Sequence, residues 1–328
     1  MSNKSGLNIT RYAKNPILTP KKDNWWESQA VFNCSTLYDG NTVHMLYRAI
    51  GEYELYTSKI GYASSTDGFS FERRQDIAIP ITEKYEEYGM EDPRIMKIDD
   101  QIYITYVVLS DYVKKKPKVY SAIAKTIDYI KFDKLGIISN EFEDNKDLVL
   151  FPEKFHFGDD FNNSKNQYWS LNRPSKYNDP YHRTDKPSIW LRKGSTFFNM
   201  EDDILLLKPE QDWEELKIGS GPAPIKTDKG WLLIYHGVDK NKIYRAGAAI
   251  LDLNDPTNVL ARTRRPFLEP VETYEKFGDV NNVVFPTGTS IIDGKLLVYY
   301  GGADKVCCVA SVDLSEFLEY ILDDNVVK

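Results

Sequence analysis

The sequence is poor in cysteine, and what it lacks excludes several classes of protein. Its 328 residues include only Cys34, Cys307 and Cys308. An odd count with an adjacent pair does not make a disulfide framework, and no cysteines and histidines stand at the spacing of a metal site. No stretch approaches the roughly 18 apolar residues of a membrane span, and the first residues lack the apolar run of a signal peptide. We expect a cytoplasmic protein without metal, cofactor or membrane partner.

An excess of basic residues is also missing. Lys and Arg number 42 against 49 Asp and Glu, which gives a net charge of −7. Nucleic-acid-binding proteins carry a basic footprint, so we expect no nucleic-acid partner. Aromatic residues, in contrast, make up 13% of the chain. They favour strands over helices, and exposed aromatic rings suit the flat faces of sugars.

A tight polar turn followed by an alternating aromatic or aliphatic strand recurs along the chain, a pattern typical of β-hairpins. The clearest strands of this kind are residues 41–48, 101–106, 231–236 and 295–300. The turns before them lie 60, 130 and 64 residues apart. Because 130 is twice 65, a fifth copy is expected near residue 165, and residues 163–171 fit the pattern.

Each of the five copies is followed by a third strand, and none shows helical periodicity. These strands are predicted near residues 60–65, 120–124, 188–192, 247–252 and 306–310. Several strands in each repeat indicate propeller blades around a central channel. The prediction is an all-β, five-bladed β-propeller with a funnel-shaped active site, built as one domain from residues 1–328. A sandwich of five consecutive hairpins is the rival interpretation, and residues 316–328 are expected to form a short terminal helix.

The first strand of each blade lines the channel in such a fold. The predicted first strands are residues 31–35, 90–94, 150–154, 219–224 and 284–288. In an antiparallel hairpin, the start of the first strand and the end of the second reach the same rim. Six polar residues at such positions should therefore converge on one mouth of the channel: Asn33, Arg48, Asp92, Arg173, His236 and Asp304.

Such a mouth combines an anion pocket with one candidate acid. Arg48, Arg173 and His236, with Lys217 nearby, suit the oxygens of phosphate or carboxylate. Asp92 is the candidate acid. Ordinary glycosidases need two carboxylates, whereas an anion pocket in place of the second carboxylate lets phosphate serve as the nucleophile.

The residues resemble those of a known family along nearly the whole chain. The shared segments are residues 91–94, 171–174, 217–227, 230–237, 244–253, 284–288 and 299–304, which include Glu-Asp-Pro-Arg and Tyr-Tyr-Gly-Gly-Ala-Asp. In these segments the chain resembles glycoside hydrolase family 130, the β-mannoside phosphorylases and related β-mannosidases.

The resemblance implies a five-bladed propeller and an inverting phosphorolysis. Asp92 would be the catalytic acid, with its proton reaching the glycosidic oxygen through the mannose 3-hydroxyl. Phosphate would attack C1 from the opposite face, so that a β-mannosyl disaccharide or oligosaccharide yields α-mannose 1-phosphate and the acceptor sugar. The positions that match phosphate contacts are Arg48, Arg173, Lys217 and His236, with Arg192 as a weaker match. The expected substrate contacts are Asn33, Ser35, Arg94, Tyr244 and Asp304.

Several alternatives stay open at the level of the sequence. An inverting β-mannosidase would need a second carboxylate, for which Glu153 and Asp304 are candidates, and a non-catalytic carbohydrate-binding propeller would need none. Arg94 either contacts substrate or pairs with an acid such as Glu91. Acceptor choice should depend on the loops at residues 52–58, 111–118 and 177–186. The oligomeric state is open, a homo-oligomer included.

Overall fold

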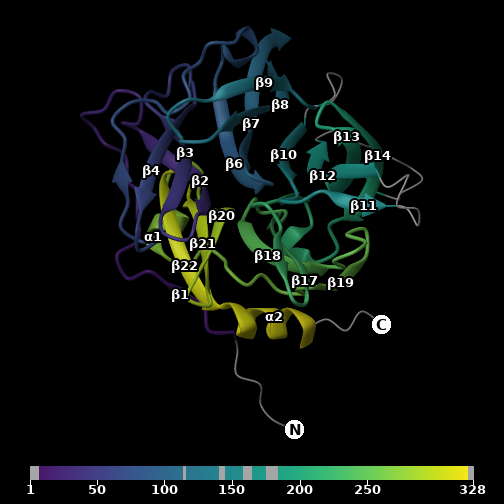
Figure 1. Ribbon diagram of the computed structural model, residues 1–328. Coiled ribbons are helices and arrows are strands. Elements are labelled where there is room, and N and C mark those ends of the chain that lie inside the picture. The colour runs from purple at the N-terminus through teal and green to yellow at the C-terminus, as the bar shows by residue number, and fades with distance from the viewer. Residues whose placement is uncertain (1–6, 114–115, 140–144, 158–164, 175–183, 324–328) are drawn as a thin grey trace.

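The computed structural model describes residues 7–113, 116–139, 145–157, 165–174 and 184–323. Its strands form five separate sheets that follow one another around a central axis (Figure 1). Within each sheet the neighbouring strands run antiparallel. The all-β class and the five-bladed propeller are therefore confirmed.

The first strand of each blade carries the residues that face the axis. These strands are β2 (Ala30–Tyr38), β6 (Met90–Ile98), β10 (Asn145–Leu150), β15 (Lys217–Ser220) and β20 (Val284–Ile292). In blades one, two and five they include the predicted segments. In blade three the prediction was wrong, because Phe151-Pro152 resembles Phe285-Pro286 of blade five and drew the strand about five residues too late. In blade four the strand begins at Lys217, two residues before the predicted start.

The hairpins that defined the repeat are present in every blade. The second strands are β3 (Val43–Ile50), β7 (Gln101–Val113), β12 (Lys165–Pro174), β17 (Gly230–Val238) and β21 (Lys295–Gly302). The third strands are β4 (Lys59–Ser65), β8 (Lys116–Thr126), β13 (Ile189–Thr196), β18 (Tyr244–Leu251) and β22 (Val306–Asp313). Short extra strands β11 (Phe155–Phe157) and β16 (Ile225–Thr227) pair with β12 and β17.

The outermost strand of the fifth blade comes from the other end of the chain. Four blades finish with β5 (Glu72–Arg73), β9 (Asp133–Ile137), β14 (Asn199–Leu207) and β19 (Val259–Arg262), whereas blade five takes β1 (Thr10–Arg11). Thr10 pairs with Ser311 of β22, so the start of the described chain closes the ring. Repeat counting did not predict this closure.

The predicted terminal helix is α2 (Leu314–Asp323), which packs Phe317, Leu318 and Ile321 against the apolar cluster between blades four and five. It lies at the outer edge of the propeller (Figure 1). No helix in the described ranges has the length and apolar character needed to cross a bilayer.

A β-bulge interrupts the first strand of blades one, two, three and five, and in the first three of these it carries an Asn or Asp. In each case the register shifts by one residue against the second strand. The residue at the bulge in the first three is Asn33, Asp92 or Asp147, with φ of 50°, 50° and 59°. Asn and Asp tolerate this left-handed conformation better than bulkier residues. A bulge re-aims the side chain it carries, and here three polar side chains are turned to the same place in successive blades.

Four blades share a second device, a buried glutamate bound by a tyrosine and a cation. The glutamate precedes the first strand, the tyrosine lies on the second strand, and the cation comes from the fourth. The sets are Glu27 with Tyr47 and Arg73, Glu86 with Tyr106 and Lys134, Glu214 with Tyr235 and Arg262, and Glu275 with Tyr300 and Arg11. Three of the glutamates also accept backbone N–H groups in short helical turns, η1 (Lys84–Glu86), η2 (Asp212–Glu214) and α1 (Thr273–Lys276). Each set thus ties the outer edge of a blade to its inner part.

Removing one of these glutamates should weaken the whole domain. Glu214→Ala removes the carboxylate 2.6 Å from the buried Arg262 guanidinium and leaves the exposed Glu210, 3.4 Å away, as its acidic partner. Loss of one partner from a buried ion pair costs about 3 to 5 kcal/mol, and the remaining pair with Glu210 places the expected cost near the lower end of that range. We expect urea denaturation to show that loss in the free energy of unfolding. The neighbouring Glu215→Ala, at an exposed position, should change it by less than about 0.5 kcal/mol. Equal effects of the two substitutions would contradict the role assigned to the buried set.

Candidate active site

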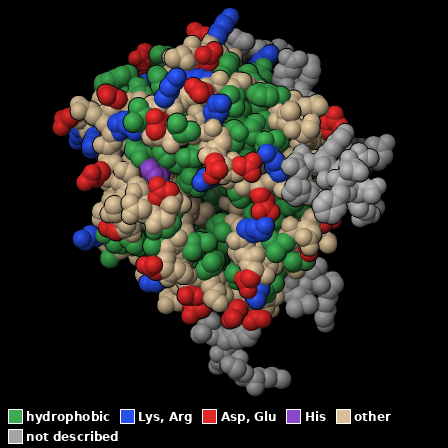
Figure 2. All heavy atoms as spheres, viewed as in Figure 1, with side chains coloured by type: hydrophobic (Ala, Val, Ile, Leu, Met, Phe, Trp, Pro, Cys, Tyr) green, Lys and Arg blue, Asp and Glu red, His purple; other side chains and the backbone are tan. Residues whose placement is uncertain are grey.

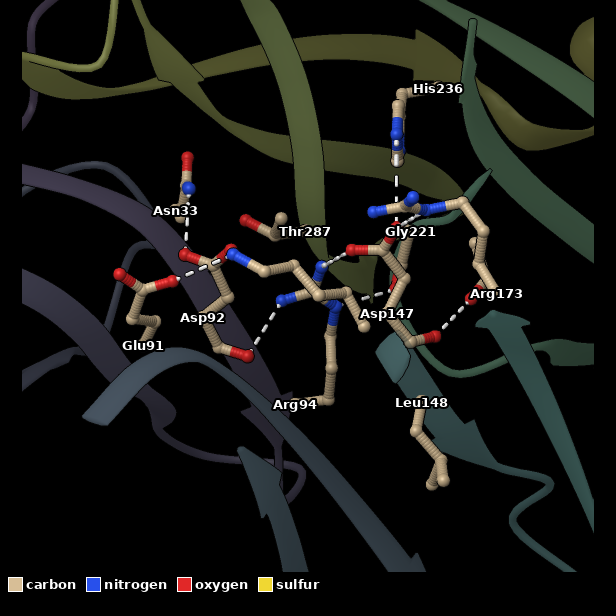
Figure 3. A network of polar contacts seen from close by, with 12 residues as sticks. Asn33, Glu91, Asp92, Arg94, Asp147, Leu148, Arg173, Gly221, His236 and Thr287 are labelled. Atoms are coloured by element: carbon tan, nitrogen blue, oxygen red, sulfur yellow. Dashed lines mark hydrogen bonds and ion pairs between the residues drawn. The ribbon is translucent and has the colours of Figure 1, made fainter. Parts of the chain in front are cut away.

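Polar side chains from four blades meet where the bulges face the ends of the second strands. We call this set the central cluster: Asn33, Arg48, Glu91, Asp92, Arg94, Asp147, Arg173 and His236 (Figure 3). Arg48, Arg173 and His236 occupy equivalent positions on the second strands of their blades. Arg48 and Arg173 pair with the residue just before the bulge, and His236 pairs with Gly219 at the corresponding place in blade four. The predicted convergence of Asn33, Asp92 and these three basic side chains is what the structure shows.

Asp92 is held through one of its two carboxylate oxygens. Asn33 Nδ2 donates to Asp92 Oδ1 at 2.8 Å, and Arg48 Nη1 lies 3.3 Å from the same atom. Among the described residues no hydrogen bond reaches Oδ2. The side chain is 9% exposed. The contacts orient the carboxylate and leave its second oxygen for a ligand.

Arg48 is shared between two acids. Its Nη2 donates to Glu91 Oε1 at 2.6 Å, and Lys146 Nζ lies 3.1 Å from Glu91 Oε2. Burial opposes ionisation of this carboxyl, but the charges of Arg48 and Lys146 hold the pKa of Glu91 well below its usual range. Glu91 is therefore a fixed counter-ion for the cationic side chains around it.

Asp147 plays the corresponding part in blade three. Arg173 Nε donates to its Oδ2 at 2.6 Å, and His236 Nε2 and Arg94 Nη2 each lie 3.9 Å from one of its oxygens. Burial again opposes ionisation, and the nearby Arg173 keeps the pKa of Asp147 below its usual range. Sequence reasoning missed this residue because it placed the blade three strand too late. The available signal was its match to Asn33 and Asp92 in the repeat.

His236 is neutral in this environment. Burial lowers the pKa of His236 to about 3, with Asp147 opposing that shift and Arg173 adding to it. Its Nδ1 is buried and makes no hydrogen bond with a described residue, and its ring packs 4.5 Å from that of Phe285. Gly219 faces this pair, since a Cβ there would collide with Asp147 Oδ2 and lie 2.5 Å from His236 Cε1.

Arg94 is the most deeply buried arginine of the cluster, which argues against the expectation that it contacts substrate. It is 1% exposed. Its Nε donates to the carbonyl of Gly221 at 2.7 Å and its Nη1 to that of Asp92 at 3.0 Å. The alternative, pairing with an acid, holds for Asp147, whose Oδ1 lies 3.9 Å from Arg94 Nη2, and not for Glu91 among its described contacts. Arg94 instead joins blade two to blade four across the axis, because its long side chain spans the channel.

Three of the predicted residues are half-buried at the edge of the cluster: Lys217, Tyr244 and Asp304. Lys217 Nζ lies 5.1 Å from the centre of the Tyr244 ring. Burial and the charge of Arg173 lower the pKa of Lys217 to about 8. Burial raises the pKa of Asp304 to about 7, with Arg48 opposing it. Charged side chains also gather near the middle of the face seen in Figure 2.

Other predicted residues do not belong to this arrangement. Ser35 is 1% exposed, and its hydroxyl accepts a hydrogen bond from the backbone N–H of Ile95 at 2.9 Å, so it links blades one and two. Arg192 pairs with Asp203 on the outer strands of blade three. Glu153 is paired with Lys226 at 2.8 Å near the surface, which removes it as a second carboxylate of the site.

The cluster and its edge contain more basic than acidic side chains. Arg48, Arg94, Lys146, Arg173 and Lys217 face three firmly placed carboxylates, those of Glu91, Asp92 and Asp147. Asp304 is only partly ionised at neutral pH because its pKa is about 7. The surplus is positive and suits an anion. Within the described ranges no group of three or more His, Cys, Asp or Glu side chains is arranged to hold a metal ion.

Comparisons with known proteins agree over nearly the whole chain. A family model described as beta-1,4-mannooligosaccharide phosphorylase matches residues 10–323. The 1,2-beta-oligomannan phosphorylase of Thermoanaerobacter sp. (strain X514) is 38% identical over 316 residues, covering 94% of this chain and 99% of that protein. A beta-1,2-mannobiose phosphorylase from the same organism is 35% identical, covering 93% and 97%. The solved beta-1,2-mannobiose phosphorylase of Listeria innocua, in complex with beta-1,2-mannobiose, has a TM-score of 0.81 at 28% identity, covering 96% of this chain and 99% of that one.

The neutral state of His236 is directly measurable. Because its pKa lies near 3, we expect its imidazole ¹⁵N signals to stay at neutral-ring positions from pH 8 down to about pH 5. The His236→Asn variant identifies those signals among the four histidines of the chain. A titration midpoint near the ordinary value of about 6.5 would contradict the buried environment described above.

Proposed function

The chain belongs to glycoside hydrolase family 130 and is a β-mannoside phosphorylase, and on that premise we propose that the central cluster carries out an inverting phosphorolysis of β-1,2-linked manno-oligosaccharides. The products are α-mannose 1-phosphate and the shortened acceptor. The linkage follows the two Thermoanaerobacter relatives, both named for β-1,2-linked substrates. The observation that carries the mechanism is the positive surplus beside a single well-oriented carboxylate.

In this proposal phosphate binds to Arg48, Arg173, Lys217 and His236. Guanidinium groups match phosphate oxygens in a forked geometry. The neutral ring of His236 supplies a directed N–H without adding charge. Glu91 and Asp147 already neutralise part of the charge of Arg48 and Arg173. The positive charge that remains is therefore close to the negative charge of a phosphate dianion.

Asp92 is the proposed general acid. Oδ1 is fixed by Asn33 and Arg48, so Oδ2 is the atom that delivers the proton, through the mannose 3-hydroxyl, to the departing oxygen. A hydroxyl relay lets the acid act at a distance from the bond that breaks. Asp304 and Tyr244, at the edge of the cluster, are the proposed contacts of the mannosyl unit, together with Asn33. Arg94 and Ser35, both buried, position these groups.

Phosphate takes the part that a second carboxylate has in an inverting hydrolase. There, a general base some 6.5 to 9.5 Å from the acid activates water. Asp304 is the carboxyl of this site that suits such a role, because its pKa of about 7 leaves it partly ionised. A hydrolase working through Asp304 is therefore the alternative that the experiment below must distinguish.

The reaction also indicates where the enzyme works. It consumes inorganic phosphate and releases a charged sugar phosphate, which does not cross a lipid bilayer unaided. We therefore propose a cytoplasmic enzyme that uses residues 1–328 as one catalytic domain, with a manno-oligosaccharide and phosphate as its only partners in the reaction.

Asp92→Asn should abolish most of the activity without disturbing the fold. The Asn oxygen can still accept from Asn33 and Arg48, but the second atom becomes an amide nitrogen, whose N–H is far too weak an acid to protonate the departing oxygen. We expect kcat for the phosphorolysis of β-1,2-mannobiose to fall about 10²- to 10⁴-fold. Phosphate consumption measures the rate, and thermal unfolding checks the fold. Asp100→Asn, at an exposed position in the turn after the same strand, should keep the original rate.

The same assay separates the alternatives. Cleavage that proceeds equally well without phosphate would contradict phosphorolysis and favour hydrolysis through Asp304. Faster turnover of β-1,4-mannobiose than of the β-1,2-linked disaccharide would contradict the proposed linkage while leaving the phosphorolysis intact. Full activity of Asp92→Asn would remove the proposed acid.

A further inference from the structure

We propose that Tyr56 and Tyr53 form a stacking platform for the acceptor side of the substrate, on which the first and second sugars beyond the cleaved bond lie in turn. The proposal rests on the proposed function. If the proposal holds, two side chains of the loop between β3 and β4 let the enzyme distinguish oligosaccharides from disaccharides.

Tyr56 begins the platform directly beside the central cluster. The Cζ atom of Arg48 lies 5.8 Å from the centre of the Tyr56 ring, and the ring packs against the small buried group that contains Phe32 and Ile50. The side chain is half-buried. One part of the ring is therefore fixed by protein contacts beside Arg48, which also contacts the proposed acid Asp92. In an inverting reaction the departing sugar lies on the side of the acid, opposite the attacking phosphate.

The backbone of Tyr56 is held in a conformation that a bulky residue rarely adopts. Its φ is 56°, in the left-handed region that favours glycine and asparagine. The Tyr56 hydroxyl donates to Asp279 Oδ2 at 2.6 Å, from the segment that leads into blade five. Strained conformations persist where surrounding contacts enforce them, and they concentrate at ligand sites. The bond to Asp279 thus sets where the ring stands relative to the mouth.

Tyr53 extends the aromatic surface outward. Its ring stacks on that of Tyr56, with centroids 5.9 Å apart and planes at 22°. Lys305 Nζ donates to the Tyr53 hydroxyl at 2.7 Å, and Lys305 directly follows Asp304 of the site. Tyr53 nevertheless remains 42% exposed. A purely structural role in packing blade one against blade five would explain Tyr56. It would not explain why the ring of Tyr53 is held in place by Lys305 and yet remains exposed to solvent.

The chemistry of this surface fits a neutral sugar chain. Aromatic rings with a polar tip offer an apolar face and hydrogen-bonding groups together, which matches a pyranose with its carbon–hydrogen face and its hydroxyls. The two rings are also tied down before binding, so little side-chain freedom is lost when a sugar stacks on them. Of the three loops expected to govern acceptor choice, this one is described, whereas residues 114–115 and 177–183 of the other two lie outside the described residues.

The experiment compares chain lengths in Tyr53→Ala. With saturating phosphate, we expect the ratio of KM for β-1,2-mannotriose to KM for β-1,2-mannobiose to rise about three- to tenfold over that of the original enzyme. The trisaccharide reaches the outer ring, whereas the disaccharide ends at Tyr56. Tyr56→Phe, which loses the bond to Asp279, should raise KM for both sugars and leave KM for phosphate as it was.

The matched control is Leu55→Ala in the same loop, where the side chain is 74% exposed and outside the platform; its kinetics should equal those of the original enzyme. An unchanged KM ratio in Tyr53→Ala, or the same change in Leu55→Ala, overturns the platform. An original enzyme that consumes no phosphate with either sugar overturns the proposed function instead, so the two failures are distinguishable.

Discussion

Three successive first strands each carry one extra residue, and in all three that residue is an Asn or Asp with positive φ. The site depends on this repeated bulge. An ordinary strand alternates its side chains between two faces and would pack these polar groups against the neighbouring blades. The bulge turns them toward the axis instead. There Asn33 holds Asp92, and Asp147 holds Arg173.

Once several charges are buried together, they have to satisfy one another. Arg48 lies between Glu91 and Asp92, and Arg94 donates to the carbonyl of Gly221 across the channel and to that of Asp92 on its own strand. The four buried glutamate sets solve the problem of buried charge in the outer parts of the blades, because each carboxylate there is bound by both a tyrosine and a cation. Blade three departs from that pattern, since Asn172 stands where the other second strands have the tyrosine, opposite the bulge at Asp147. It is in this blade that the second strand ends in Arg173 of the site.

The repeat in the sequence was sufficient to predict the propeller, because turns and alternating strands are local and recur at an even spacing. It also predicted that Arg48, Arg173 and His236 would meet, since hairpin geometry alone brings the ends of equivalent strands to one rim. The closure by β1 was not predictable in this way, because Thr10 and Ser311 are far apart in sequence. Asp147 was missed because the first strand of blade three was predicted about five residues too late, beyond the bulge that carries this residue. Arg94 shows the remaining difficulty: its place in the motif was right, but residue type does not reveal that the side chain is buried and bound to backbone carbonyls.

The central claim is that this cationic cluster directs phosphate, rather than water, to the far face of a β-mannoside. The most direct measurement is combined ¹H and ³¹P NMR of the enzyme acting on β-1,2-mannobiose in phosphate buffer, recorded from the first turnovers. The account predicts that α-mannose 1-phosphate is the first mannosyl product and that its ³¹P signal grows as the inorganic phosphate signal declines by the same amount. A β-configured sugar phosphate would contradict inversion, and free mannose formed without loss of inorganic phosphate would contradict phosphorolysis itself.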